Sequence, residues 1–337
     1  MWRSNARTAI ANLPGGCYLD FLHPVKAGQS LPNPVRARVV AAVPVVPADA
    51  VQTEKYPKMK NFNGKLVLVT GGSSGIGLAV SKKLAGLGAN VWILARREDI
   101  LKSALEEIKK SAAGSNQSFG YLVADVSSWE QVQKVLGEFV SRTGTPDLLI
   151  NSTGISRPGE FMELDPEIFH QLMEVNYMGP VHVIKCLIPG MVQRKSGYIV
   201  NISSMAGLGG IYGYSAYGAT KYALHGLTDV LMYELKPYNI KFSIVFPPDT
   251  NTPGFEADQE YLPAITKQMN ADFSGVMQAE EVAKAIVNGI ENDKYFILPG
   301  FTNNILNGLN NIIGYRLAGW VVDLSRNKLA RKNTKVS

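Results

Sequence analysis

Cysteine and histidine are scarce in this chain. Its 337 residues include two cysteines, Cys17 and Cys186, and four histidines that show no ligand spacing. Two thiols cannot build a disulfide framework or a thiolate metal site, so small secreted folds are excluded and no bound metal is expected. Charged residues make up only 18% of the chain and hydrophobic residues 46%, which allows a substantial core and argues against a disordered chain.

The middle of the chain also lacks an excess of positive charge, although the whole sequence has a net charge of +6. Residues 1–60 hold eight Lys/Arg against three acids, and residues 325–337 hold five basic residues and no acid. The segment between them is left with 21 basic and 25 acidic residues. Nucleic acid is therefore not an expected partner. Basic tails more often solvate a terminus or contact anionic lipid.

The two ends differ in composition from the middle. Residues 1–60 are rich in proline and arginine, which predicts a disordered or targeting extension, with a natural start at Met59 as an alternative. Residues 301–337 form a C-terminal segment that would be amphipathic as a helix, followed by a basic tail. Its apolar face would comprise Ile305, Leu309, Ile312, Ile313, Leu317, Trp320, Val321 and Leu324.

Two interpretations of the C-terminal segment stay open. It either lies in a membrane interface or packs on the domain or on another subunit. The first predicts a membrane-associated protein on the cytosolic side, at the endoplasmic reticulum in a eukaryote and in the cytoplasm or at the inner membrane in a bacterium.

Residues 61–300 alternate between short apolar runs and segments with helical spacing. This alternation predicts one α/β domain, a Rossmann-type doubly wound fold with a mostly parallel seven-stranded sheet and helices on both faces. The expected strands are 66–70, 91–95, 121–124, 147–151, 198–202, 241–246 and 295–298. The expected helices are 75–87, 99–112, 128–142, 165–193, 217–236 and 279–292.

A glycine-rich turn separates the first strand from the first helix. Glycines there let a pyrophosphate approach the backbone, and the helix N-terminus offers free N–H groups and a positive dipole end. The turn therefore predicts a dinucleotide site at Gly71, Gly72, Ser73, Ser74, Gly75, Ile76 and Gly77.

The residues after the second and third strands bear on which dinucleotide binds. Ala95 stands where a carboxylate would bind a free ribose 2′-OH, and Arg96 and Arg97 follow. Guanidinium groups suit a 2′-phosphate, so the cofactor prediction is NADPH/NADP⁺; an exposed arginine pair is the alternative. Asp125 is suited to accept a hydrogen bond from the adenine amine, with Val126 packed against the adenine ring. The alternative is that Asp125 caps the next helix or forms an Asx turn.

Four polar residues in the second half are catalytic candidates. Tyr217 and Lys221 are four residues apart, so they share one face of a helix. A nearby ammonium favours the phenolate and lowers the pKa of the tyrosine. Ser204 follows a strand, at the edge where open α/β sheets bind ligands, and Asn176 interrupts an apolar helical stretch.

Together these motifs resemble the short-chain dehydrogenase/reductase family over about residues 62–298. The resemblance implies a Ser–Tyr–Lys–Asn tetrad in which Tyr217 donates a proton to a carbonyl oxygen that Ser204 holds. Lys221 would bind the nicotinamide ribose, and Asn176 would anchor a water of the proton relay. Further cofactor contacts are implied at Asn151, Tyr217, Lys221, Pro247 and Thr252. Thr153 departs from the alanine usual in the Asn-x-Ala-Gly motif, which affects local packing.

Within that family, the stretch 246–255, Phe-Pro-Pro-Asp-Thr-Asn-Thr-Pro-Gly-Phe, is similar to 3-ketodihydrosphingosine reductases. This similarity implies NADPH-dependent reduction of 3-oxosphinganine to sphinganine, a homo-oligomer, and a substrate lid at 255–278. Ile100 departs from a lysine that this branch often has, so Arg97 would substitute. Another lipophilic ketone, such as a steroid, retinoid or 3-oxoacyl compound, is the alternative substrate. A non-catalytic nucleotide-sensing or scaffold protein is the alternative class, but such proteins usually lack a tetrad member.

Overall fold

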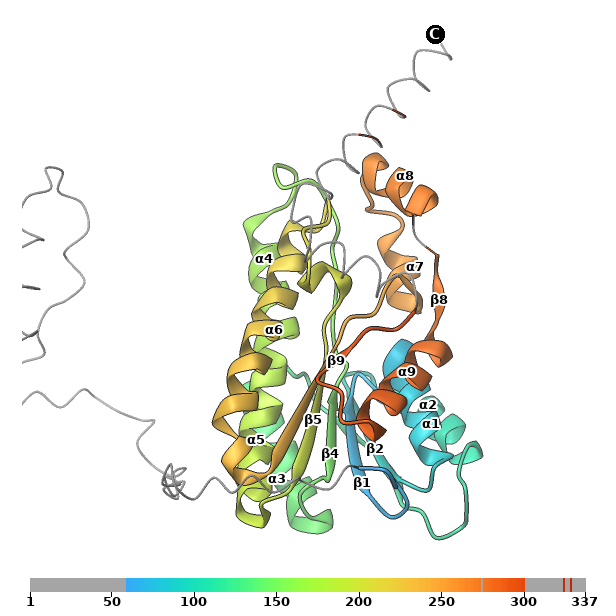
Figure 1. Ribbon diagram of the computed structural model, residues 1–337, viewed down its shortest axis with the longest axis vertical. Coiled ribbons are helices and arrows are strands. Elements are labelled where there is room, and N and C mark those ends of the chain that lie inside the picture. The colour runs from blue at the N-terminus through green and yellow to red at the C-terminus, as the bar shows by residue number, and fades with distance from the viewer. Residues whose placement is uncertain (1–58, 274, 301–323, 325–327, 329–337) are drawn as a thin grey trace, which may run out of the picture. The chain divides into compact units, whose positions relative to one another are not determined.

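The computed structural model describes residues 59–273, 275–300, 324 and 328. Its sheet has seven parallel strands in the order β3-β2-β1-β4-β5-β6-β9 (Figure 1). The strands are β1 (Leu66–Thr70), β2 (Asn90–Ala95), β3 (Phe119–Val123), β4 (Leu148–Asn151), β5 (Gly197–Ile202), β6 (Ile240–Val245) and β9 (Phe296–Ile297). The strand order reverses between β1 and β4, and this is where a doubly wound sheet opens a crevice at its carboxyl edge.

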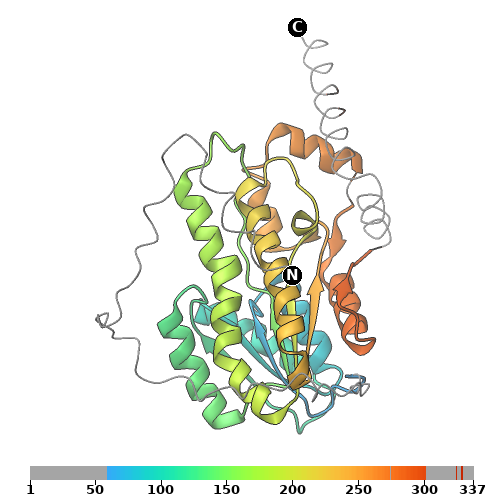
Figure 2. The same ribbon diagram turned by 60° about the vertical axis from the view of Figure 1, so that its left-hand side comes forward.

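Helices cover both faces of this sheet, as Figures 1 and 2 show. One face carries α1 (Gly75–Ala85), α2 (Glu98–Lys110) and α9 (Ala279–Glu291). The other carries α3 (Trp129–Thr143), α5 (Gly179–Arg194) and α6 (Ser215–Glu234). A further helix, α4 (Pro166–Met173), packs against α6. The predicted doubly wound fold is confirmed.

The central strands are apolar throughout because both of their faces are covered. In β1, Val67 and Val69 face the core beside α1 and α9, whereas Leu68 faces the core beside α3 and α5. All three side chains are completely buried. Alternate residues of one strand thus anchor two separate hydrophobic layers, and the polar residues that follow each strand are left at its carboxyl end.

The predicted helix over 165–193 is interrupted. A π-helical turn, Glu174–Met178, lies between α4 and α5. Pro180 has no backbone N–H to continue the regular i→i−4 ladder, and π-turns of this kind often occur at functional sites. Asn176 lies in the middle of this turn and is completely buried.

The expected lid stretch 255–278 has its own secondary structure. It includes most of α7 (Pro253–Asp258), then α8 (Ala264–Phe273) and β8 (Met277–Gln278), which pairs in parallel with β7 (Thr250–Asn251). The remaining short elements are the 3₁₀ turns η3 (Met205–Gly207) and η4 (Lys236–Tyr238). Alternation of apolar residues did not predict α7, α8 or the small β7–β8 pair.

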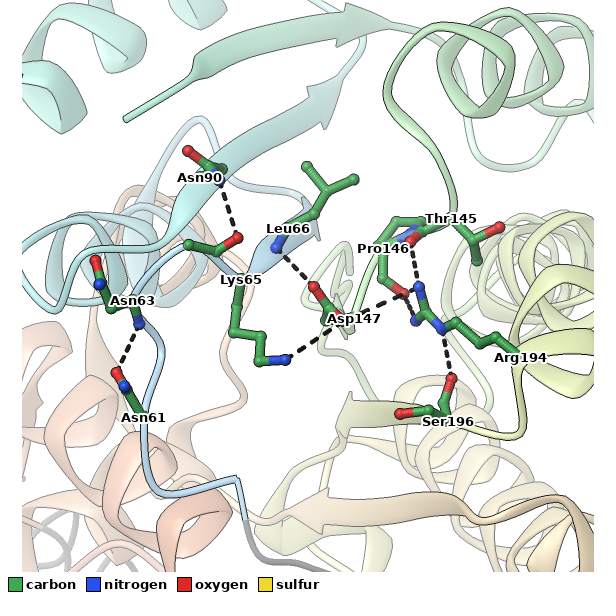
Figure 3. A network of polar contacts seen from close by, with 11 residues as sticks. Asn61, Asn63, Lys65, Leu66, Asn90, Thr145, Pro146, Asp147, Arg194 and Ser196 are labelled. Atoms are coloured by element: carbon green, nitrogen blue, oxygen red, sulfur yellow. Dashed lines mark hydrogen bonds and ion pairs between the residues drawn. The ribbon is translucent and has the colours of Figure 1, made fainter. Parts of the chain in front are cut away.

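A polar network ties the amino ends of the strands together (Figure 3). Asp147 accepts the backbone N–H of Leu66 at 2.9 Å and lies 3.8 Å from the Lys65 ammonium and 4.0 Å from the Arg194 guanidinium. Arg194, at the end of α5, also donates to the carbonyl oxygens of Thr145, Pro146 and Ser196. These bonds fix the starts of β1, β4 and β5 and leave the opposite edge for the site.

Residues 1–58 of the predicted extension 1–60 and most of the C-terminal segment lie outside the described residues. The domain boundaries at 60 and 300 therefore stay predictions. Within the described ranges, no helix combines the length and the apolarity needed to cross a membrane.

Candidate active site

The carboxyl ends of the strands open into a cavity of about 910 Å³. Parallel strands bring the residues that follow them to one edge of the sheet, so segments far apart in the sequence meet there. The predicted residues that line the cavity are Gly71, Ser73, Ser74, Gly75, Ile76, Gly77, Arg96, Arg97, Asp125, Val126, Ser204, Tyr217, Lys221, Pro247 and Thr252. Gly72, Asn151 and Asn176 are not part of the lining.

The glycine-rich turn forms a cradle at the start of α1. Gly71 and Gly75 have φ angles of +66° and +52°, a region that favours glycine. A Cβ on Gly77 would lie 2.3 Å from the carbonyl oxygen of Gly71, so the helix and the turn touch backbone to backbone. No side chain caps the helix and no acid lies in its first turn, which leaves the N–H groups available to an anion. Gly72 acts differently, because it packs against Ile93.

A further orphan group supports the fit of a dinucleotide. Thr153 is one of the residues that line the cavity, and its hydroxyl is buried without a hydrogen-bond partner among the described residues. A buried polar atom without a partner usually marks a place where a ligand or water binds. The glycine cradle and this hydroxyl fit a dinucleotide, which the turn, Arg96, Arg97 and Asp125 would hold.

Arg96 and Asp125 meet at the rim of the cavity. The Arg96 guanidinium lies 3.8 Å from one Asp125 oxygen, and the arginine side chain is 63% exposed. The other Asp125 oxygen accepts the backbone N–H and the hydroxyl of Ser127 at 3.0 and 2.7 Å. Asp125 therefore forms the Asx turn that was its alternative interpretation, and it still lines the cavity. Arg97 is exposed at the start of α2.

The catalytic candidates meet on α6 and at the end of β5. Tyr217 and Ser204 both line the cavity, and the Ser204 hydroxyl is close enough to Tyr217 to lower the pKa of its phenol. One helical turn later, the Lys221 ammonium lies 5.4 Å from the centre of the Tyr217 ring. It donates to the carbonyl oxygen of Ile202 at 3.0 Å, and Lys221 is almost fully buried. Two hydroxyls thus share a small volume in front of a buried cation.

Burial changes the acidity of both groups. It raises the pKa of Tyr217 to about 12, although the nearby Ser204 hydroxyl works in the opposite direction. Burial also lowers the pKa of Lys221 to about 8. The lysine was expected to lower the tyrosine pKa, but in the protein alone desolvation of the phenolate outweighs that effect. The phenol is therefore protonated at neutral pH, as a proton donor must be.

Asn176 is buried outside the cavity lining and bonds to two segments that form the cavity. Its side-chain oxygen accepts the backbone N–H of Ile155 at 2.9 Å, and its amide donates to the Ile155 carbonyl at 2.9 Å and to the Thr220 hydroxyl at 3.0 Å. Thr220 in turn donates to the carbonyl oxygen of Tyr217 at 2.7 Å. Asn176 thereby joins the loop after β4 to the helix that carries Tyr217.

Asn151 also lies away from the cavity. Its amide donates to the side-chain oxygen of Asn201 at 2.8 Å, and Asn201 donates to Thr228 at 2.9 Å. These buried bonds link β4, β5 and α6. The predicted cofactor contact at Asn151 is not visible in this arrangement, since the residue is 2% exposed and does not line the cavity.

The cavity is also lined by polar residues that sequence reasoning did not single out as site residues, among them Tyr214, Asp249 and Asp258. Tyr214 lies 5.8 Å from Tyr217, ring centre to ring centre. Asp249 follows the Pro247-Pro248 pair after β6, and Asp258 ends α7. In the sequence, only their proximity to the motifs described above could have indicated these residues. Whether they come together at the cavity depends on how the stretch after β6 folds.

Comparison with known proteins agrees with this geometry. The short chain dehydrogenase family profile matches residues 65–261. A 3-dehydrosphinganine reductase of Danio rerio is 40% identical over 232 residues, 68% of this chain and 70% of the relative. A 3-ketodihydrosphingosine reductase of Bos taurus is 38% identical over the same length.

Solved structures show the same fold. A short-chain dehydrogenase/reductase from Burkholderia phymatum in complex with NAD has a TM-score of 0.67 at 24% identity, covering 75% of this chain and 95% of that one. L-Sorbose reductase from Gluconobacter frateurii, complexed with NADPH and L-sorbose, has a TM-score of 0.63 at 26% identity over 72% and 98%. The chain therefore belongs to the short-chain dehydrogenase/reductase family, oxidoreductases that act on CH–OH and C=O groups with a nicotinamide cofactor.

Proposed function

We propose that this protein reduces 3-oxosphinganine to sphinganine with NADPH, in sphingolipid biosynthesis, and that Tyr217 is the proton donor. The observation that carries the reaction type is that Tyr217 and Ser204 line the same cavity wall, with the Lys221 ammonium 5.4 Å from the centre of the Tyr217 ring. The substrate is supported by the relatives from Danio rerio and Bos taurus, whose names specify this reduction.

Each residue has a role that follows from its position. The nicotinamide, when bound, supplies the hydride that adds to the carbonyl carbon. The hydroxyls of Ser204 and Tyr217 hold the carbonyl oxygen, and Tyr217 gives it a proton as negative charge develops there. The Lys221 cation stabilises the phenolate that remains and binds the nicotinamide ribose. Asn176 keeps the loop after β4 against α6 and anchors the water that returns a proton.

The preference for NADPH rests on the rim of the cavity. Ala95 offers no carboxylate to a ribose 2′-OH, while Arg96 and Arg97 bring two guanidinium groups to the rim. Both arginines are exposed, so a 2′-phosphate can reach them without moving the core. A bidentate guanidinium–phosphate contact favours the phosphorylated cofactor.

A long-chain ketone fits the remaining part of the cavity. Apolar side chains from four separate segments line it, namely Ile155, Met205, Ile211, Phe255 and Met269. Phe255 and Met269 come from α7 and α8, the helices of the expected lid. An alkyl chain bound among these residues would leave its carbonyl at the two hydroxyls.

The test supplies 3-oxosphinganine and NADPH to the full chain and follows the nicotinamide absorbance. We expect oxidation of NADPH with formation of sphinganine, identified by mass spectrometry. A panel of a steroid ketone, a retinal and a 3-oxoacyl thioester runs beside it. Turnover of panel members alone would contradict the assigned substrate while leaving the reaction type intact.

The sequence supports two further parts of this proposal, a membrane surface as the place of action and a homo-oligomer as the assembly. The apolar positions between 305 and 324 and the basic residues after them would bring the enzyme to the cytosolic side of a membrane, where its substrate dissolves. In a eukaryote this is the endoplasmic reticulum. Flotation with anionic vesicles should retain the full chain and lose a chain truncated after Gly300; equal flotation would refute the membrane role. Light scattering of the purified protein should give a multiple of the 36.6 kDa chain mass.

A further inference from the structure

Two carboxylates line the catalytic cavity on the side formed by the loop after β6 and by α7. Asp249 lies directly after Pro248, and Asp258 is the last residue of α7. Both are half-buried. Among the residues that the structure describes, neither carboxylate has an ion-pair partner within 4.0 Å. Negative charge therefore collects in the same cavity as the reacting hydroxyls.

The nearest groups do not neutralise this charge. Arg157 acts on Asp258 electrostatically, but its guanidinium stacks on the Tyr261 ring at 3.2 Å, and one of its nitrogens is buried without a hydrogen-bond partner. The Ser156 hydroxyl also lowers the pKa of Asp258, but it is buried and has no hydrogen-bond partner among the described residues. Lys221 faces Tyr217 and the Ile202 carbonyl. The other charged groups of the lining, Arg96, Arg97 and Asp125, follow β2 and β3 at the dinucleotide part of the cavity.

The carboxylates act directly on the catalytic tyrosine. Burial raises the pKa of Asp258 to about 6 and raises that of Asp249 above its ordinary value. The charges of Asp258 and Asp249 in turn raise the pKa values of Tyr217 and of Tyr214. Asp258, Asp249 and Tyr217 line the same cavity, so a cation bound there beside the two carboxylates would be stabilised by their charge.

The substrate of the proposed function carries a cation at the matching place. In 3-oxosphinganine the carbon next to the carbonyl bears an amino group, which is protonated at neutral pH. Once the carbonyl oxygen is held by Tyr217 and Ser204, this ammonium cannot be more than a few ångströms away, whichever way the alkyl chain runs. Steroid, retinoid and 3-oxoacyl ketones have no such group.

We propose that Asp258 and Asp249 form a subsite for the ammonium group of an amino-ketone substrate and so determine specificity against neutral ketones. This inference rests on the proposed function and deepens it. The ammonium gains charge-assisted hydrogen bonds, and the two carboxylates gain an ion-pair partner, which Asp258 otherwise has only as the electrostatic effect of Arg157. Neutral ketones would instead leave two desolvated carboxylates unpaired, which selects against them.

The experiment compares two substrates of equal chain length, 3-oxosphinganine and 1-hydroxyoctadecan-3-one, which lacks only the amino group. Each is assayed with NADPH on the full-length wild type and on Asp258→Asn and Asp249→Asn. The matched control is Glu256→Gln, which removes a carboxylate from the same helix but at an exposed position outside the cavity lining.

For the amino ketone, kcat/KM should fall roughly 10- to 100-fold in Asp258→Asn and Asp249→Asn, mainly through KM. For the desamino ketone, kcat/KM should stay the same or rise, and the KM for NADPH should not change. Glu256→Gln should behave as the wild type with both ketones. Thermal unfolding and NADPH titration verify that each variant is folded.

Equal losses on the two ketones would overturn the inference, because they would indicate a structural effect. Unchanged kinetics in both variants would overturn it as well. Failure of the proposed function is distinguishable, since it would show in the wild type as absence of turnover with 3-oxosphinganine. Wild-type turnover of that substrate without any preference over the desamino ketone would reject the subsite and keep the proposed function.

Discussion

The glycine cradle makes a sharp prediction for Gly77→Ala. Gly77 lies in the first turn of α1, and an added Cβ would be 2.3 Å from the carbonyl oxygen and 2.8 Å from the carbonyl carbon of Gly71. Both of these are backbone atoms, which cannot rotate away as a flexible side chain can. The turn or the helix must therefore move by about 0.7 Å to restore a contact of 3.0 Å.

This displacement has two measurable costs. Overpacking of this kind destabilises a protein by about 1–3 kcal/mol, and the better helix propensity of alanine offsets about 1 kcal/mol of that. The free energy of unfolding should therefore fall by up to about 2 kcal/mol. Because the turn that moves is the cradle of the dinucleotide, the dissociation constant of NADPH should rise roughly 10-fold or more.

Gly137→Ala is the matched control. Gly137 lies on the exposed side of α3, and nothing is within 4 Å of its added Cβ. The same substitution there should stabilise the protein by up to about 1 kcal/mol and leave NADPH binding unchanged. Urea unfolding and fluorescence titration of NADPH measure both effects. If Gly77→Ala binds NADPH as tightly as Gly137→Ala, the turn is not the cofactor cradle.

Two further predictions concern the charged groups of the cavity. Arg96→Ala and Arg97→Ala should each lower kcat/KM for NADPH roughly 10-fold and leave kcat/KM for NADH unchanged. Steady-state kinetics with both cofactors measure this effect. An equal fall in kcat/KM for NADPH and for NADH would contradict the 2′-phosphate role. Lys221 has a pKa of about 8 in the folded protein against 10.5 in the unfolded chain, so between these pH values the unfolded chain holds a proton that the folded protein has released. Its contribution to the free energy of unfolding therefore increases with pH there, by at most about 1.4 kcal/mol per pH unit. Urea unfolding between pH 7.5 and 9.5 should show this increase in the wild type relative to Lys221→Met; identical pH profiles would show that the lysine is not desolvated.

Most of the fold could be predicted because its strands are buried on both faces. A run such as Leu148–Asn151 is fully buried, so its apolar character is continuous and easily separated from the helices around it. The polar residues that follow such runs then meet at one edge by topology alone. This is why the sequence alone predicts that Ser204, Tyr217 and the glycine turn lie at one edge of the sheet.

The parts that were missed depend on tertiary contacts. The π-turn around Asn176 follows from the missing N–H of Pro180 and from the bonds to Ile155 and Thr220, which no helical spacing encodes. Asn151 belongs to a recognisable motif, yet it bonds to Asn201 behind the cavity. A motif thus gives the residue type that a family keeps, but not whether the side chain faces the ligand or supports a neighbouring strand.

The stretch after β6 shows the same limit. Its residues have no clear apolar period, and α7 and α8 form where the chain folds back toward the cavity. The position of Asp258 at the cavity wall depends on that path. Asp249 lies within a recognisable motif, but only the fold shows that it lines one cavity with Tyr217 and Asp258.

The central claim, that the Tyr217 hydroxyl protonates the carbonyl oxygen of the substrate, is tested most directly by Tyr217→Phe. This substitution removes one oxygen and keeps the ring that packs near Tyr214. Stopped-flow reduction of 3-oxosphinganine at saturating NADPH should slow by at least about 10²-fold, the scale of general acid catalysis, with the dissociation constant of NADPH unchanged. A variant that reduces the ketone at the wild-type rate would contradict the account.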